Sequence, residues 1–151
     1  MSGDRKEPFL QLSELLTGFG TLALCGTGMA DAYLETMDAA LSAGNVDELL
    51  AAFGRLLSGA GRDAAVVSEI LDHPKLGPMA RSLILLWYTG AWTPLPDGWR
   101  ATYGASPLDT KRVVSPASYQ AGLQWVAAKA HPAGGGQQGF GSWAAAPESA
   151  R

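Results

Sequence analysis

The chain has 151 residues, a formal net charge of −3 and 47% hydrophobic residues. This length suits one domain with its own core, and the composition is ordinary for a globular protein. Because phosphate binding needs a basic face, the mild acidity and the lack of a lysine- or arginine-rich stretch argue against a nucleic-acid partner. No apolar run approaches the ~18–20 residues of a membrane helix, so we expect no membrane span.

Apolar residues recur at helical spacing over the first ninety residues, which predicts an all-α fold. We expect a compact bundle of about five to six helices followed by an irregular C-terminal strap rich in glycine and aromatic residues. The predicted helices lie near residues 7–16, 29–42, 46–58, 63–73 and 78–89.

Local signals support these boundaries. Pro8 suits the first turn of a helix and Gly18 suits a C-cap. Asn45 is a good N-cap, with Glu48 three residues later as its capping-box partner. Residues 78–89 are apolar on nearly every side, which predicts the central helix of the bundle, with Leu86 inside.

The signals change after residue 89. Prolines and glycines break residues 90–114 into an irregular connection, in which the KRVVS stretch is at most a short edge strand. Ser115 and Pro116 then begin a short helix. We therefore expect one helical domain over residues 1–151, consisting of a bundle (7–89), a connection (90–114), and a short helix with an extended tail (115–151).

The tail combines glycine with large aromatic residues. From His131 to Gly141 the sequence is HPAGGGQQGFG, which is too glycine-rich for a helix or a strand. Trp125, Phe140 and Trp143 nevertheless each carry ~150–250 Å² of surface to bury. The tail must therefore lie against its own domain or against another protein, and the sequence leaves both open.

No catalytic motif stands out. The sequence has no nucleophile elbow, no dinucleotide or phosphate-binding glycine loop, and no HExxH pair. His73 and His131 each precede a proline, a step more typical of a helix end or loop than of a metal ligand. Asp31, Glu35 and Asp38 share a helical spacing that could meet a metal, although a solvated helix face explains it better. Cys25, the single cysteine, is expected to be a small buried side chain, with an intermolecular disulfide as the alternative.

Five tryptophans exceed what the bundle needs, since four lie outside its predicted interior. Surplus aromatic surface is typical of protein interfaces. The rival interpretation is a stand-alone ligand-binding protein or enzyme with an aromatic pocket near Trp87, Tyr88 and Trp92. A pocket of that kind needs convergent polar groups, and Arg81 and Arg100 are the only candidates.

Four stretches together resemble a known family. They are FLQLSELLTG (Phe9–Gly18), LILLWYTGAW (Leu83–Trp92), SPASYQAGLQW (Ser115–Trp125) and AHPAGGGQQGFGSWAAAPE (Ala130–Glu148). The chain resembles, over nearly its whole length, the small (gamma) subunit of membrane-bound FAD-dependent sugar and alcohol dehydrogenases, which include the sorbitol, fructose, glucose and gluconate enzymes.

The resemblance implies a non-catalytic accessory subunit. In this family a large oxidoreductase subunit of the glucose–methanol–choline type carries the FAD, and a cytochrome c subunit often takes the electrons. The small subunit has no cofactor or metal of its own and helps the large subunit to mature and reach the periplasm, commonly through a twin-arginine signal. The N-terminal sequence MSGDRKEPF shows no such signal, so a signal removed before this start and a cytoplasmic location are the alternatives.

With the aromatic surplus, the resemblance indicates that the chain acts on a protein partner and has no catalytic residue. The residues expected to bind that partner come from the connection and the tail. They are Trp92, Trp99, Tyr119, Trp125, His131, Phe140 and Trp143.

Overall fold

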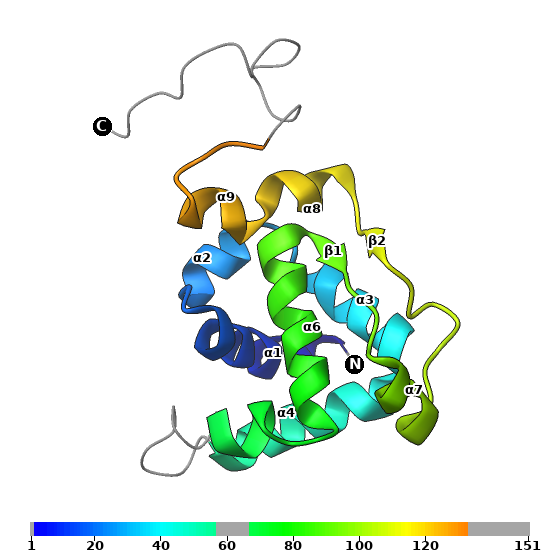
Figure 1. The fold of residues 1–151 in the computed structure, drawn as a ribbon. Coiled ribbons are helices and arrows are strands. Elements are labelled where there is room, and N and C mark those ends of the chain that lie inside the picture. The colour runs from blue at the N-terminus through cyan, green and yellow to red at the C-terminus, as the bar shows by residue number, and fades with distance from the viewer. Residues whose placement is uncertain (1, 57–66, 133–151) are drawn as a thin grey trace.

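The computed structural model describes residues 2–56 and 67–132, and within them the predicted all-α fold is confirmed (Figure 1). The helices are α1 (Ser2–Thr17), α2 (Thr21–Gly26), α3 (Ala30–Leu41), α4 (Ala43–Leu56), the π-helical turn η1 (Val67–Leu71), α6 (Leu76–Thr89), α7 (Asp97–Tyr103), α8 (Pro116–Ala121) and α9 (Leu123–Ala127). Strands β1 (Ala91–Trp92) and β2 (Arg112–Val113) form one antiparallel pair. None of the described helices is both long and apolar enough to cross a bilayer.

Helix α6 is the central element, as predicted. It packs against α1, α3, η1, β1 and α9, and Figure 1 shows it upright in the middle of the molecule. Leu83, Leu86 and Trp87 are buried, whereas Leu85 keeps 41% of its surface exposed. The helix is therefore enclosed on most sides and open along a narrow strip.

The contacts of Trp87 fix α6 against the first half of the chain. Its indole Nε1 donates a buried hydrogen bond of 2.9 Å to Ser13 Oγ on α1. Its ring meets Tyr33 of α3 edge-on, with 4.8 Å between ring centroids, and lies 6.2 Å from the ring of Phe9. One side chain thus joins three helices, and the polar end of the indole is satisfied within the core.

The first predicted helix boundary is wrong. Helix α1 begins at Ser2, so Pro8 lies inside the helix and not in its first turn. Gly18 does end the helix as predicted, with φ of +81° and its N–H bonded to the carbonyl of Glu14. A left-handed residue after the last turn is the usual role of glycine there.

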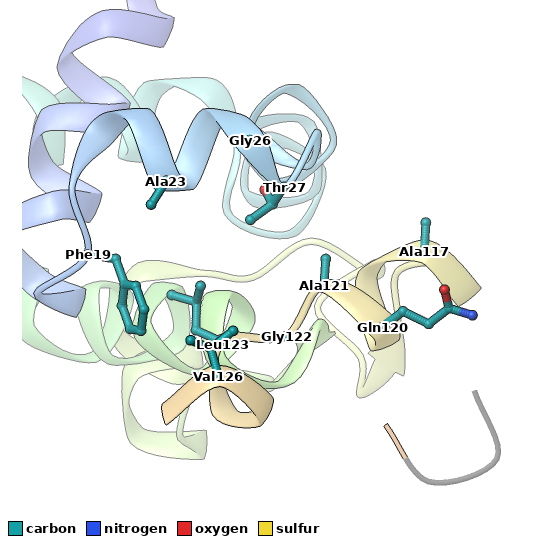
Figure 2. Close-up of a pocket in the computed structure, with 10 residues that line it drawn as sticks. All are labelled: Phe19, Ala23, Gly26, Thr27, Ala117, Gln120, Ala121, Gly122, Leu123 and Val126. Carbon is teal, nitrogen blue, oxygen red and sulfur yellow. The ribbon is translucent and has the colours of Figure 1, made fainter. Parts of the chain in front are cut away.

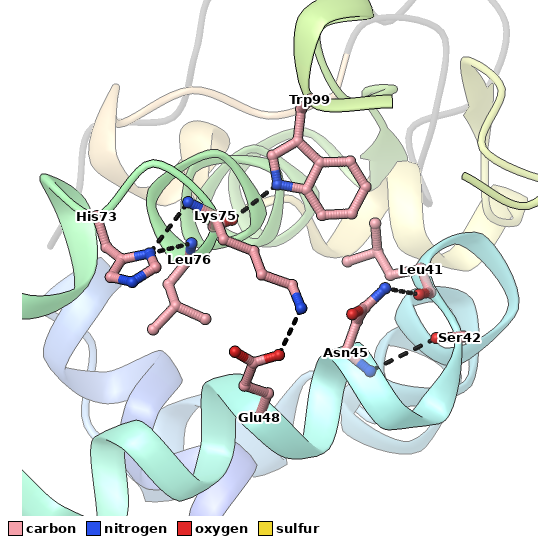
Figure 3. A network of polar contacts seen from close by, with 8 residues as sticks. All are labelled: Leu41, Ser42, Asn45, Glu48, His73, Lys75, Leu76 and Trp99. Carbon is pink, nitrogen blue, oxygen red and sulfur yellow. Dashed lines mark hydrogen bonds and ion pairs between the residues drawn. The ribbon is translucent and has the colours of Figure 1, made fainter. Parts of the chain in front are cut away.

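The predicted cap of the third helix is also wrong (Figure 3). Helix α4 begins at Ala43, and Asn45 lies inside it, where its side-chain Nδ2 donates to the carbonyl of Leu41. Glu48 forms no capping box and pairs with Lys75 at the start of α6. Asn45 therefore ties α4 back to the end of α3, and Glu48 ties it forward to α6.

His73 and Trp99 complete this junction (Figure 3). The Nδ1 atom of His73 accepts hydrogen bonds from the N–H groups of Lys75 (3.0 Å) and Leu76 (3.2 Å), so the imidazole caps the start of α6. Trp99 Nε1 donates to the carbonyl of Lys75 at 2.8 Å. Of the helix predicted near residues 63–73, the structure describes η1, and residues 57–66 lie outside the described part.

Residues 90–114, predicted as irregular, hold β1, α7 and β2. The two strands pair and so hold the beginning and the end of this segment together: Ala91 pairs with Val113, and Trp92 pairs with Arg112. The short helix predicted after Ser115 is confirmed as α8, with reciprocal hydrogen bonds between Ser115 and Ser118 that form a capping box. Helix α2 was not predicted, because six residues are too few to show a helical period.

Gly90 joins α6 to the C-terminal layer. Its φ is +72°, and a Cβ atom there would lie 2.2 Å from the carbonyl oxygen of Ser118. The carbonyl of Gly90 accepts hydrogen bonds from Ser118 Oγ (2.8 Å) and from the N–H of Val114 (3.0 Å). Because both the backbone angle and the close contact require glycine, this position sets where α8 sits on the bundle.

We predict that Leu86→Asp prevents folding. The change buries an unpaired carboxylate in the central helix at a cost of about 5 kcal/mol, a large part of the stability of a typical domain. Leu85→Asp is the matched control. The side chain of Leu85 reaches solvent, so a carboxylate at this position should be tolerated. Thermal melts followed by helical circular dichroism test the pair, and a normal melting curve for Leu86→Asp would contradict a central α6.

A second prediction concerns Tyr33, whose buried hydroxyl has no hydrogen-bond partner among the described residues. Burial raises the pKa of Tyr33 to about 12 from an ordinary 10.0, since the core disfavours the phenolate. Folding stability should therefore fall as the pH rises from about 10 to about 12, because the unfolded state loses the proton first.

Tyr33→Phe should make that alkaline loss shallower and raise stability at neutral pH by about 1 kcal/mol, because an unsatisfied hydroxyl is removed. Tyr88→Phe is the comparison: Tyr88 Oη donates to the carbonyl of Thr17 at 2.9 Å, so its loss should cost about 1 kcal/mol. Urea titrations at neutral and alkaline pH measure both. Equal effects of the two variants would show that the two hydroxyls are equivalent.

Candidate functional site

An open apolar groove of about 520 Å³ lies between α2 and the α8–α9 pair (Figure 2). Phe19 and Ala23 form one wall, and Ala121, Gly122, Leu123 and Val126 form the opposite one. This is called the α2–α9 groove below.

Two large apolar side chains on the helices that form the α2–α9 groove face solvent, and Val126 lines the groove itself. Leu22 on α2 is 87% exposed and Val126 on α9 is 67% exposed. Single exposed apolar residues are common, but a groove with exposed apolar residues along it is typical of an interaction site. This face of the molecule is the best candidate for binding.

The polar groups of the α2–α9 groove are few. Thr27 Oγ1 donates to the carbonyl of Leu24 (2.7 Å) and accepts from the N–H of Met29, so it serves the local turn. Gln120 lies at one end (Figure 2). A small-molecule or catalytic site would gather several convergent polar groups, whereas this groove suits an apolar side chain of a polypeptide.

The described chain ends shortly after α9, the helix that carries Val126 of the groove. Helix α9 ends in a Schellman motif: the N–H of Lys129 bonds to the carbonyl of Val126 (3.1 Å), and that of Ala130 to the carbonyl of Trp125 (2.8 Å). Lys129 has φ of +55°, the left-handed conformation of such caps. The turn reverses the chain, and Figure 1 shows the orange segment after α9 running back toward α8, on the side of the α8–α9 pair that faces away from α2.

Two of the predicted partner-binding residues prove to be core residues. Trp92 is 0% exposed and Trp99 is 5% exposed, so neither offers a surface to a partner. The carboxylate of Asp109, itself buried, accepts hydrogen bonds from Trp92 Nε1 (2.7 Å) and from the N–H of Leu95 (3.2 Å). Arg100 Nε lies 3.4 Å from the same carboxylate. The tryptophans of the connection therefore hold residues 91–109 onto the bundle.

The remaining predicted residues lie nearer the groove or beyond the described part. Tyr119 and Trp125 are partly buried and pack edge-on, with ring centroids 5.6 Å apart, and Trp125 Nε1 donates to the carbonyl of Tyr119. This pair stiffens the α8–α9 layer behind the groove. His131 is partly buried at the end of the described chain, and Phe140 and Trp143 lie outside the described residues.

The other candidates from the sequence have structural roles. Asp38 and Asp47 pair with Arg5, and hydrogen bonding to Asp38 holds the pKa of that guanidinium above its usual value. Asp31 pairs with Lys6. In the part of the chain that the structure describes, no three His, Cys, Asp or Glu side chains are placed to hold a metal ion.

Cys25 is exposed, so the predicted burial of its side chain is wrong. Because α2 presents only Leu24 to the core, Cys25 lies outside the packed interior. A second cavity of about 230 Å³ borders Glu48, Glu69 and His73. Glu48 and His73 are already engaged at the α4–α6 junction.

Comparisons with protein-family models, with curated proteins and with solved structures found no match.

The α2–α9 groove was missed at the sequence level. Leu22, Leu123 and Val126 are ordinary aliphatic residues, and nothing in their spacing distinguishes exposed from buried ones. A usable signal lies in the small residues Ala117, Ala121 and Gly122, which leave one side of the last helices without large side chains. The prediction from aromatic residues instead selected Trp92 and Trp99 of the connection, which are buried.

We predict that Asp109→Ala releases residues 91–109 from the bundle. The change leaves the indole N–H of Trp92 and the N–H of Leu95 buried without an acceptor, at a cost of about 3 kcal/mol. Asp109→Asn, which keeps the shape and one acceptor oxygen, should cost less. Urea denaturation followed by tryptophan fluorescence orders the three proteins, and an alanine variant as stable as the parent would refute this role of Asp109.

Proposed function

We propose that this chain is the non-catalytic small subunit of an FAD-dependent sugar or alcohol dehydrogenase complex. In this proposal it binds the large flavoprotein subunit and supports the maturation, stability or export of that subunit. The partner carries the FAD and performs the oxidation. A cytochrome c subunit would complete the electron path, and the complex would work in the periplasm or at the membrane.

The observation that carries the proposal is the open apolar groove between α2 and the α8–α9 pair. The groove has no convergent polar groups, and it is lined by the exposed Val126 of α9, the helix from which the chain continues into the aromatic tail. An apolar surface next to a segment with Phe140 and Trp143 favours protein binding over small-molecule chemistry.

The resemblance supplies the kind of partner. Of its last two stretches, Ser115–Trp125 covers α8 and the start of α9, which border the groove, and Ala130–Glu148 covers the tail. The partner-binding residues retained in the proposal are therefore Tyr119, Trp125, His131, Phe140 and Trp143.

The rival proposal of an aromatic ligand pocket receives less support. The rings of Trp87 and Trp92 are packed in the core, and their N–H groups are bonded to Ser13 and Asp109. Neither of the two cavities described above is lined by Trp87, Tyr88 or Trp92.

The test is affinity purification of the tagged full-length chain from its own cells. The eluate should show flavin absorbance and dye-linked sugar or alcohol dehydrogenase activity, whereas the chain made alone should be colourless and inactive. A full-length chain that elutes without flavin or activity from cells with the matching dehydrogenase would contradict the proposal. So would dehydrogenase activity of the pure chain.

A truncated chain ending after Ala130 locates the binding segment. The Schellman bond from the N–H of Ala130 is kept, so α9 stays capped and helical circular dichroism should be unchanged. Flavin capture should fall strongly, and Trp143→Ala in the full chain should reduce it, since tryptophan anchors are worth ~2 kcal/mol or more at interfaces. Full capture by the truncated chain would place the partner surface elsewhere.

A further inference from the structure

We propose that the α2–α9 groove is the seat of the chain's own C-terminal segment, with Phe140 as the side chain that enters it. The inference concerns the isolated chain. It narrows the set of partner-binding residues proposed above, because it assigns Phe140 to the chain's own groove and leaves Trp143 for the partner, and it can be tested without the flavoprotein.

The walls of the groove suit a large flat ring. Ala23, Ala121 and Gly122 take up little space, while Phe19, Leu123 and Val126 offer apolar contact (Figure 2). A phenyl ring has ~150 Å² or more of surface to bury, and its burial here would also shield Val126 from water.

The position of the chain end and the length of the segment put the groove within its reach. Val126 on α9 lines the groove, and after the left-handed turn at Lys129 the described chain runs back toward α8 and ends at Pro132, six residues beyond Val126 (Figure 1). From Pro132, the last described residue, Phe140 is eight residues on, which spans at most ~26–29 Å when fully extended. A group tethered over so short a distance competes at an effective concentration in the mM range, so a segment of the same chain has an advantage over a separate molecule.

The sequence of the segment selects Phe140. After Val126 the only large apolar side chains are Phe140 and Trp143. Phe140 stands between Gly139 and Gly141, and residues without a Cβ atom let the backbone approach a narrow site closely. Trp143 follows Ser142 and has a bulkier ring, so it is left on the outside of the seated segment.

The native cysteine offers a probe of this arrangement. Cys25 is exposed on α2 between Leu24 and Gly26, next to the groove wall, and it is the single cysteine of the chain. In the full-length protein, Gln138→Cys places a second thiol two residues before Phe140. With oxidised glutathione as the oxidant, the two thiols should form a disulfide within one chain at a rate independent of protein concentration.

Variants in the Gln138→Cys background identify the seated ring. Phe140→Ala should slow formation of the intramolecular disulfide by about tenfold, whereas Trp143→Ala should leave it unchanged. Val126→Glu places a charge in the groove and should also slow it. Leu108→Glu is the matched control: Leu108 is 51% exposed and lies outside the groove lining, so the rate should not change.

Three outcomes would overturn the proposal. Disulfide-linked dimers that increase with concentration would assign the groove to a second copy of the chain. An unchanged rate in both Phe140→Ala and Val126→Glu would mean that the segment does not use the groove and that a separate partner covers it. A rate that falls in Trp143→Ala but not in Phe140→Ala would overturn the assignment to Phe140.

Discussion

The hydrogen bond from the indole of Trp87 to Ser13 is the contact on which the rest of the structure depends. It links residues 74 positions apart in the sequence and lies fully inside the core. A buried donor without its acceptor is costly, so this bond fixes the rotation of α6 against α1. Once α6 is fixed, Gly90 at its end determines where β2 and α8 attach, and these in turn position α9 and the groove.

The fold could be predicted where periodicity and burial agree. Helices α3 and α6 were predicted correctly. The apolar residues of α3 recur on one face and those of α6 on nearly all sides, and these are the faces that the fold buries. The roles of the tryptophans could not be predicted in the same way. Trp92 becomes a core residue through Asp109, a carboxylate 17 residues later, and a single sequence does not show that the two meet.

None of the residues that line the candidate site was predicted, and the reason is again physical. The sequence prediction rested on the tail, where glycine and aromatic residues occur together, and most of the tail lies outside the described residues. The surface itself consists of alanines, glycines and aliphatic residues from α2, α8 and α9. Only the fold places the neighbourhood of Phe19 next to that of Val126, so no local pattern could indicate a groove.

The four stretches with the family resemblance differ in whether their residues serve the packing of the core. Phe9–Gly18 and Leu83–Trp92 meet at the Trp87–Ser13 bond and the Tyr88–Thr17 bond, so a likeness there is a likeness in core packing. The last two stretches include residues with no such role in the described core. If Phe140 holds the tail on its own domain, part of the ordering cost of binding is met before a partner arrives, and Trp143 is presented outward. A short glycine-rich tail can then act as a defined docking element, with one aromatic residue for its own domain and one for the partner.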